Sequence, residues 1–152
     1  ILSQKYGGNV HKKEIVSITA STTDYNQPYE VASDDWNDYW YSKEEAFPWI
    51  CFDFKEKSIK PTNYTLKTFN CGPGYSHIKS WVLEGSNDGN TWTTLDSQTN
   101  CGLLNNKKAS FVFNCEAKES YSKLRIRMTG KNHHNGGYMC LSGVDFFGFF
   151  KE

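Results

Sequence analysis

WVLEGSNDGNTW, from Trp81 to Trp92, combines an apolar run, a polar turn and a second tryptophan. Strand-like residues flank the turn on both sides, since TWTTLDS (Thr91–Ser97) follows it. Ser, Asn, Asp and Gly tolerate positive φ or bond to their own backbone, and between apolar runs they connect antiparallel strands. The stretch therefore predicts a β-hairpin with its turn at Ser86–Gly89.

A calcium-binding loop is the alternative interpretation of this acidic, glycine-containing turn. An EF-hand loop has an invariant glycine at its sixth position, which would be Gly89. Glu84, Ser86 and Asp88 would then occupy positions one, three and five. The twelfth position would be Leu95, where an EF-hand requires a bidentate glutamate. The EF-hand interpretation fails, and the hairpin remains.

Period-two alternation of apolar residues recurs in short runs along the chain, and no segment keeps a helical apolar period for three turns. The clearest runs are Val16–Ala20, Ile50–Phe54, Tyr64–Thr68 and Leu124–Met128. Turn-forming residues separate the runs, which is typical of antiparallel β-structure. Eight or so strands predict an all-β fold, an antiparallel β-sandwich or jelly roll.

The length of 152 residues suits a single domain, expected over residues 1–152. The segment Thr22–Tyr41 is polar and aromatic without a period, so we expect a long structured loop there.

Charge and hydropathy exclude some classes of protein. Lys and Arg together number 17 and Asp and Glu number 17, so no basic footprint for nucleic acid is expected. No run of about 18 apolar residues predicts a transmembrane helix. Ile1–Glu14 lacks the apolar stretch of a signal peptide.

The five cysteines favour free thiols over a disulfide framework. Their number is odd, and no two are spaced as in a zinc ribbon. Free cysteines are usually buried and behave as small apolar residues. The cysteine pattern therefore favours a reducing, intracellular compartment, with an extracellular or cell-surface location as the alternative.

Several segments resemble the discoidin domain, also called the coagulation factor five/eight type C domain. They occur in the family's order and extend over nearly the whole chain. The segments are IVSITAS (Ile15–Ser21), DDWNDYWYS (Asp34–Ser42), PWICFDF (Pro48–Phe54), SWVLEGSNDGNTW (Ser80–Trp92), YSKLRIRMTG (Tyr121–Gly130) and LSGVDFFG (Leu141–Gly148).

The resemblance implies a jelly-roll sandwich of the galactose-binding-domain type and a recognition module without catalytic activity. The sequences of these segments are most similar to those of the family's intracellular branch, in which such domains accompany BTB, ankyrin or ubiquitin-ligase modules. Many extracellular members join their two ends by a disulfide, but here the first cysteine is Cys51 and the last is Cys140. We expect one module of a larger protein. The family buries aromatic side chains at or beside four tryptophan positions, so the resemblance also implies a core location for Trp40, Trp49, Trp81 and Trp92.

The resemblance also places three loops together at one end of the sandwich. They are Ser21–Tyr29, Asn70–His77 and Lys131–Tyr138. Aromatic faces suit the apolar side of a sugar ring, while amides, imidazoles and carboxylates suit its hydroxyls. The candidate ligand-binding residues are Asp24, Tyr25, Asn26, Asn70, Tyr75, His77, His133, His134 and Asn135.

A carbohydrate is the first expected ligand, a protein partner is the alternative, and a phospholipid is the weaker alternative. The tips of these loops carry Tyr, His and Asn, which are poor groups for insertion into a bilayer. No catalytic motif such as G-x-S-x-G, H-E-x-x-H or a P-loop occurs, so we expect no enzyme.

No cofactor is expected to be required, although a structural calcium ion is one hypothesis. By analogy with sugar-binding relatives, its ligands would be Asp35, Asp38 and Asp145. Calcium prefers six to eight oxygen ligands, and these carboxylates also fit a role in capping turns. His133 and His134 do not suggest zinc, because neighbouring side chains on a strand point to opposite sides.

Overall fold

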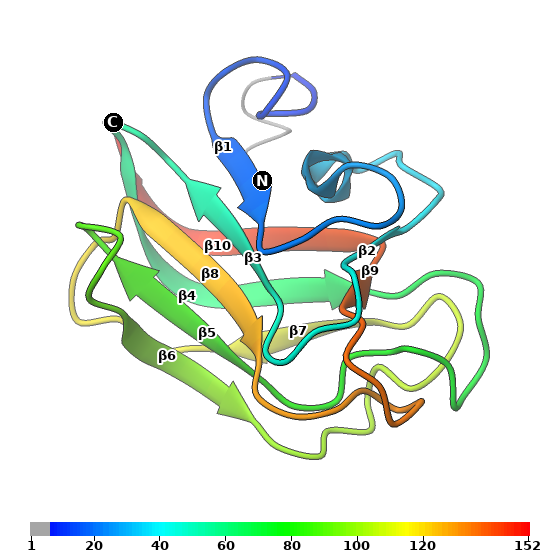
Figure 1. The fold of residues 1–152 in the computed structure, drawn as a ribbon. Coiled ribbons are helices and arrows are strands. Elements are labelled where there is room, and N and C mark those ends of the chain that lie inside the picture. The colour runs from blue at the N-terminus through cyan, green and yellow to red at the C-terminus, as the bar shows by residue number, and fades with distance from the viewer. Residues whose placement is uncertain (1–6) are drawn as a thin grey trace.

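The computed structural model describes residues 7–152, which form strands with almost no helix (Figure 1). Ile1–Tyr6 lie outside the described residues. The structure therefore describes only part of the predicted domain (1–152) and of the segment Ile1–Glu14, which was compared with a signal peptide. The elements are β1 (Ser17–Ala20), the 3-10 helix η1 (Pro28–Ala32), β2 (Trp40–Tyr41), β3 (Trp49–Asp53), β4 (Ser58–Lys67), β5 (Trp81–Ser86), β6 (Thr93–Gln98), β7 (Ser110–Asn114), β8 (Lys123–Met128), β9 (Cys140–Leu141) and β10 (Gly143–Lys151).

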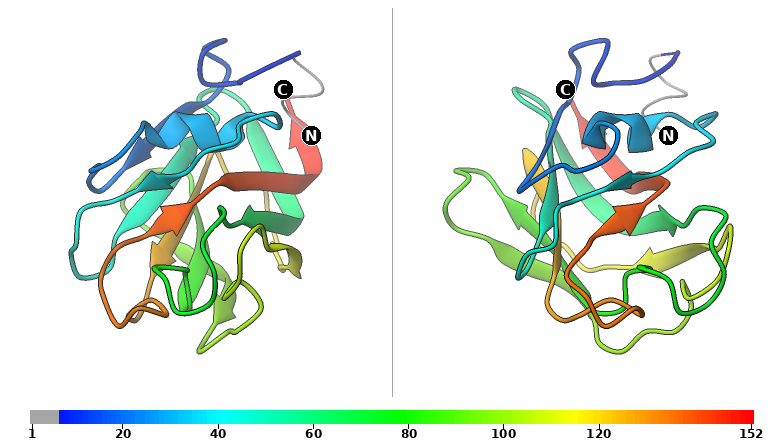
Figure 2. Two further views of the ribbon diagram at one scale, coloured as in Figure 1. Left: turned by 90° about the vertical axis from the view of Figure 1, so that its right-hand side faces the viewer. Right: turned by 45° about the vertical axis from the view of Figure 1, so that its right-hand side comes forward.

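The strands form two antiparallel sheets and one short ladder. The larger sheet has the order β1-β3-β8-β5-β6, and the other has the order β10-β4-β7. The two-residue strands β2 and β9 pair separately. The two larger sheets face each other across one hydrophobic core (Figure 1, Figure 2). The predicted all-β sandwich is confirmed.

Strand alternation explains how each sheet supplies this core. In β8, Leu124, Ile126 and Met128 are at most 1% exposed, while Arg125 and Arg127 lie on the opposite, outer face. Successive side chains of a strand point to opposite faces, so the inward set is fixed by the sequence. The predicted inward positions of the other clear runs are also buried, except Ala20, which is partly exposed.

The stretch Trp81–Trp92 forms the predicted hairpin. β5 and β6 pair antiparallel, and Gly89 in the turn has φ +78°. Asp88 Oδ1 accepts hydrogen bonds from the backbone N–H groups of Asn90 and Thr91, both at 2.8 Å. These bonds, together with one from Ser86, lower the pKa of Asp88 to about 2. The carboxylate is thus a structural part of the turn.

Two of the four tryptophans expected in the core are not there. Trp40 and Trp81 are fully buried, but Trp49 and Trp92 are partly exposed. Ile50 takes the inward position in β3, so the residue beside it must point outward. On the outer face the Arg125 guanidinium lies over Trp92, 3.9 Å from the ring centroid, and 5.8 Å from that of Trp49. The core assignment of these two residues was wrong.

The segment Thr22–Tyr41 is mostly irregular, as predicted, but it contains η1 and ends in β2. Pro28 lies at the start of η1, where its fixed φ favours helical geometry. Val31 in this helix is buried in the core. Among the described residues, no helix is long and apolar enough to cross a membrane.

Candidate ligand-binding site

The three predicted loops meet at one end of the sandwich, around the short ladder of β2 and β9. Tyr25 of the first loop forms a β-bridge with Tyr41 in β2. His77 of the second loop forms a bridge with Cys140 in β9. Tyr138 belongs to the third loop, close before β9. Backbone pairing to β2 and β9 therefore brings together segments that are far apart in sequence.

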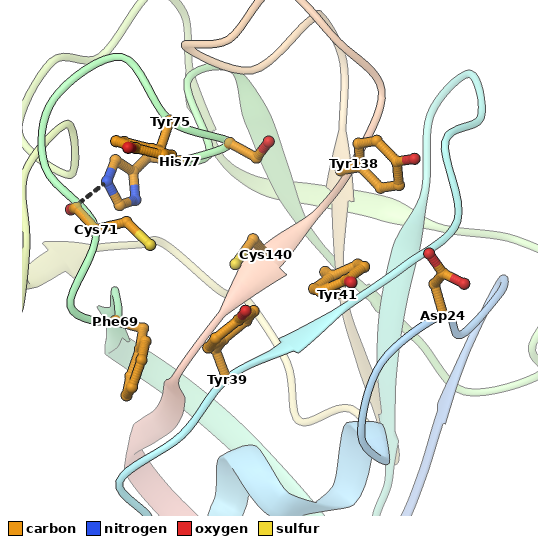
Figure 3. A pocket seen from close by; sticks show the side chains of 10 residues that line it. Asp24, Tyr39, Tyr41, Phe69, Cys71, Tyr75, His77, Tyr138 and Cys140 are labelled. Atoms are coloured by element: carbon orange, nitrogen blue, oxygen red, sulfur yellow. Dashed lines mark hydrogen bonds between the residues drawn. The ribbon is translucent and has the colours of Figure 1, made fainter.

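A pocket of about 260 Å³ opens between these segments (Figure 3). It is open to solvent on one side, and its walls are mainly aromatic. The lining residues are Asp24, Tyr39, Tyr41, Phe69, Cys71, Tyr75, Ser76, His77, Tyr138 and Cys140.

Four tyrosines and a phenylalanine pack ring against ring along one side of the pocket. The ring centroids of Tyr25, Tyr39 and Tyr41 lie 5.2 to 5.7 Å apart. Phe69 extends the group with a centroid 4.9 Å from that of Tyr39. Tyr138 meets Tyr41 edge to face at 5.8 Å. Offset and edge-to-face packing restrict ring motion, so these faces are held ready for a ligand.

The phenolic groups of Tyr39 and Tyr41 keep their protons at neutral pH. Burial raises the pKa of Tyr41, and the nearby Asp24 carboxylate raises it further. Burial also raises the pKa of Tyr39. Within the described chain, the hydroxyls of Tyr39, Tyr41 and Tyr138 make no hydrogen bond to another residue. They are therefore free to bond a ligand.

His77 holds the second loop in place. Its side chain is 3% exposed, and its Nε2 lies 2.9 Å from the carbonyl oxygens of both Cys71 and Gly72 (Figure 3). Because both partners only accept, Nε2 must carry a proton. Backbone carbonyls of the same loop therefore occupy the Nε2 edge of the ring, and His77 forms part of the pocket wall.

Asn132 has the corresponding role in the third loop. Its side chain is buried, and its Oδ1 accepts from the backbone N–H groups of His134 and Gly136. Its Nδ2 donates to the carbonyl of Tyr138 at 2.9 Å. A buried amide that uses both of its ends specifies one loop conformation, so the position of Tyr138 is fixed from within.

Comparisons with known proteins agree with the architecture. A sequence model described as F5/8 type C domain matches residues 17–142. This chain belongs to that family. The F5/8 type C domain is 30% identical over 141 residues to the E3 ubiquitin-protein ligase Ufd4 of Drosophila melanogaster. The match covers 89% of this chain but only 5% of that relative.

Solved structures share the fold at low sequence identity. One is CpGH89CBM32-5 of Clostridium perfringens, in complex with GalNAc-β-1,3-galactose, with a TM-score of 0.69 and 14% identity. The match covers 89% of this chain and 96% of that one. Another is the family 32 carbohydrate-binding module of NanJ from C. perfringens, in complex with galactose. Its TM-score is 0.68 at 10% identity, over 88% of this chain and 94% of that one.

The F5/8 type C domain brings three of the predicted binding residues to the pocket wall. Asp24, Tyr75 and His77 line it. Tyr25 is 41% exposed and stacks behind Tyr41. Asn26 has φ +57° and donates to the Tyr39 carbonyl, so it supports the wall without lining it.

Four other predicted residues do not line the pocket. Asn70 is exposed in the second loop. His133 Nε2 lies 3.1 Å from the carbonyl of Cys101, and His134 Nδ1 lies 3.0 Å from that of Gly74. Asn135 lines a separate hollow beside the loop 42–48. The two histidines therefore connect neighbouring loops in this structure.

Sequence reasoning missed the aromatic wall formed by Tyr39, Tyr41 and Phe69. The signal was present, because Tyr39 and Tyr41 flank Trp40, which is fully buried. Alternation places the two tyrosines on the side away from the core. Sequence reasoning also missed exposed apolar side chains on neighbouring loops, Phe47 at 56% and Leu103 at 51% exposure.

The described residues contain no group of three or more His, Cys, Asp or Glu side chains that could hold a metal ion. The hypothetical calcium ligands Asp35, Asp38 and Asp145 therefore do not form such a group. Asp38 Oδ1 accepts from the backbone N–H of Tyr39, and Asp145 Oδ1 accepts from that of Phe146. These contacts fit a role in shaping the backbone.

Proposed function

We propose that this F5/8 type C domain is a non-catalytic recognition module that binds a carbohydrate in the pocket lined by Tyr39, Tyr41 and Tyr138. The observation that carries the proposal is the combination of packed aromatic faces with hydroxyls that have no partner among residues 7–152. Sugars present an apolar face and a polar edge, and this wall offers a partner for each. The complexes of the two C. perfringens modules with sugars support the choice of ligand class.

The size of the pocket limits how tightly a sugar would bind. Its volume of about 260 Å³ lies just below the range of drug-sized sites, so one sugar unit would make most of the contacts. One ring stacked on tyrosine, with a few hydrogen bonds that compete with water, would give a Kd on the order of 0.1–1 mM. Repeated modules or multivalent glycans would be needed for tighter attachment.

A glycan array, followed by titration of the sugars that bind, tests the proposal. Tyr41→Ala and Tyr138→Ala should each reduce binding by at least about tenfold, because each removes part of the aromatic wall. Phe149→Ala is a matched control, since Phe149 is 71% exposed on β10 and does not line the pocket. Binding that survives both tyrosine changes at parental affinity would show that this pocket is not the site.

A protein partner is the second candidate, favoured by the similarity to the ubiquitin ligase Ufd4. In this alternative the module recruits a partner to a larger intracellular assembly, and the pocket accepts one side chain at the centre of a wider contact. A protein that binds the module and is released by Tyr41→Ala, together with no bound glycan on the array, would favour this alternative over the carbohydrate.

A further inference from the structure

We propose that the pocket selects amino sugars, with the free ammonium group held between the Asp24 carboxylate and the faces of Tyr41 and Tyr138. This proposal rests on the proposed carbohydrate recognition and specifies the class of sugar. It depends on the electrostatic character of the pocket and on its hydroxyl groups.

The charge of the pocket wall has one sign. Asp24 is the only carboxylate among the lining residues, and none of them is lysine or arginine. His77 is 3% exposed and directs its Nε2 at backbone carbonyls. Asp24 lies close enough to Tyr41 to raise the pKa of that hydroxyl, second only to burial. A ligand that enters therefore meets a negative charge without a balancing positive one.

The aromatic faces act in the same direction. The face of a tyrosine ring carries partial negative charge and attracts cations, more strongly where water is excluded. Tyr41 in β2, Tyr39 directly before that strand and Tyr138 in the third loop converge on the same space (Figure 3). Figure 3 shows the Asp24 carboxylate beside Tyr41, on the side of the pocket where Tyr138 also lies. An ammonium group at this position would meet the carboxylate and the rings together.

The free hydroxyls distinguish an amino sugar from a lysine side chain. The phenolic groups of Tyr39, Tyr41 and Tyr138 have no partner within the described residues. Ring hydroxyls of a sugar can bond to them, whereas the alkyl chain of lysine offers no polar atom before its terminus. A cationic ligand with several hydroxyls can therefore contact the Asp24 carboxylate, the tyrosine faces and the phenolic hydroxyls at once.

Matched pairs of sugars test this selection. The methyl glycosides of glucosamine and galactosamine are titrated at low salt and pH 6.5 against their N-acetylated forms, with binding followed by chemical shifts. We expect the amines to bind at least about tenfold more tightly, because acetylation removes the charge that Asp24 and the rings attract. Added salt should weaken the amines more than the N-acetyl forms.

Asp24→Asn keeps the shape of the side chain and removes its charge. It should remove most of the preference for amines, because only the weaker attraction of the rings for a cation remains. Glu56→Gln is the matched control, because Glu56 is exposed in the β3–β4 turn and does not line the pocket. It should leave the preference unchanged.

The other outcomes separate this inference from the proposed function. Equal or tighter binding of the N-acetyl sugars would overturn the selection and leave carbohydrate recognition intact. A preference for amines that persists undiminished in Asp24→Asn would overturn the role of Asp24. Binding of Nα-acetyl-lysine methylamide, with none of the four sugars bound, would overturn both proposals and indicate a protein ligand.

Discussion

The indole Nε1 of Trp81 donates a hydrogen bond to the phenolic oxygen of Tyr64 at 2.9 Å. Tyr64 in turn donates to Asp96 Oδ2 at 2.6 Å. Trp81 and Asp96 belong to the five-stranded sheet, while Tyr64 belongs to the three-stranded sheet. A chain of polar contacts thus crosses the apolar core and sets the two sheets in one relative position.

Tyr64→Phe should reduce the free energy of unfolding by about 1–3 kcal/mol, because it leaves the buried indole N–H without a partner. Chemical denaturation measures the change. Tyr75→Phe is the control, since Tyr75 is 58% exposed and should tolerate the loss of its hydroxyl. Equal stabilities of Tyr64→Phe and the parent would mean that the polar chain contributes nothing to the packing of the sheets.

Trp81→Ala and Trp49→Ala should reduce the free energy of unfolding by different amounts, although both residues begin strands of the same sheet. Trp81 is fully buried, so its truncation should cost about 3–5 kcal/mol. Trp49 is partly exposed, and its truncation should cost about 1–2 kcal/mol. The two denaturation midpoints give the comparison. A larger loss for Trp49 would contradict its position on the outer face.

Glu84 makes the stability of the domain depend on pH. Burial alone would raise the pKa of Glu84, but hydrogen bonds from Arg127 and Arg125 outweigh burial, and the pKa is lowered. A lowered carboxyl pKa stabilises the folded state above the unfolded pKa of about 4.3. This contribution is lost as the pH falls through the folded value.

Glu84→Gln should therefore be less stable than the parent at pH 7, and the difference should shrink as the pH falls below about 4. Urea titrations at pH 7, 5 and 3 measure it, with Glu56→Gln as a control for an exposed carboxylate. A difference that stays constant across this range would show that the arginine contacts do not act through the charge of Glu84.

The cysteines are expected to be reduced and slow to react. Burial raises the pKa of Cys51 to about 11 and that of Cys140 to about 12, so both thiols stay protonated at pH 8. Thiol titration of the native protein should find these two unreactive on the time scale of the partly exposed Cys71 and Cys101. All five should react after unfolding without reductant; fewer would reveal a disulfide, for which Cys71 and Cys140 are the first candidates.

Calcium should have little effect on stability. The described residues contain no group of three carboxylates arranged around one ion, so the melting temperature should be the same in calcium and in a chelator. An increase of several degrees in calcium would restore the hypothesis of a site at Asp35, Asp38 and Asp145, and substitution of Asp38 by Asn would then locate it.

The sequence predicts the sandwich well because its main signals are local. Alternation in Leu124–Met128 and the turn at Ser86–Gly89 depend on neighbours in the chain, and both are confirmed. The tryptophans show where prediction from local sequence signals fails. The same indole serves in the core at Trp81 and beside an arginine at Trp49, and only the register of the strands separates these roles.

The candidate site is less accessible to sequence reasoning because it depends on long-range pairing. His77 and His134 have ring nitrogens suited to a ligand, yet each lies against a backbone carbonyl of a loop whose path was unknown. Tyr39 and Tyr41 belong to a segment expected to be a loop, and they line the pocket because β2 pairs with β9, about a hundred residues away. The convergence of the three loops could be inferred only through the family resemblance.

The ladder of β2 and β9 also affects the kinetics of binding. Because Tyr41 and Cys140 tie the first and second loops to the same two strands, the loops are ordered when the domain folds. A ligand that enters this pocket need not immobilise a flexible segment, so little conformational entropy is lost on binding. Association should then approach the diffusion-controlled limit for a small molecule, and weak affinity would appear as rapid dissociation.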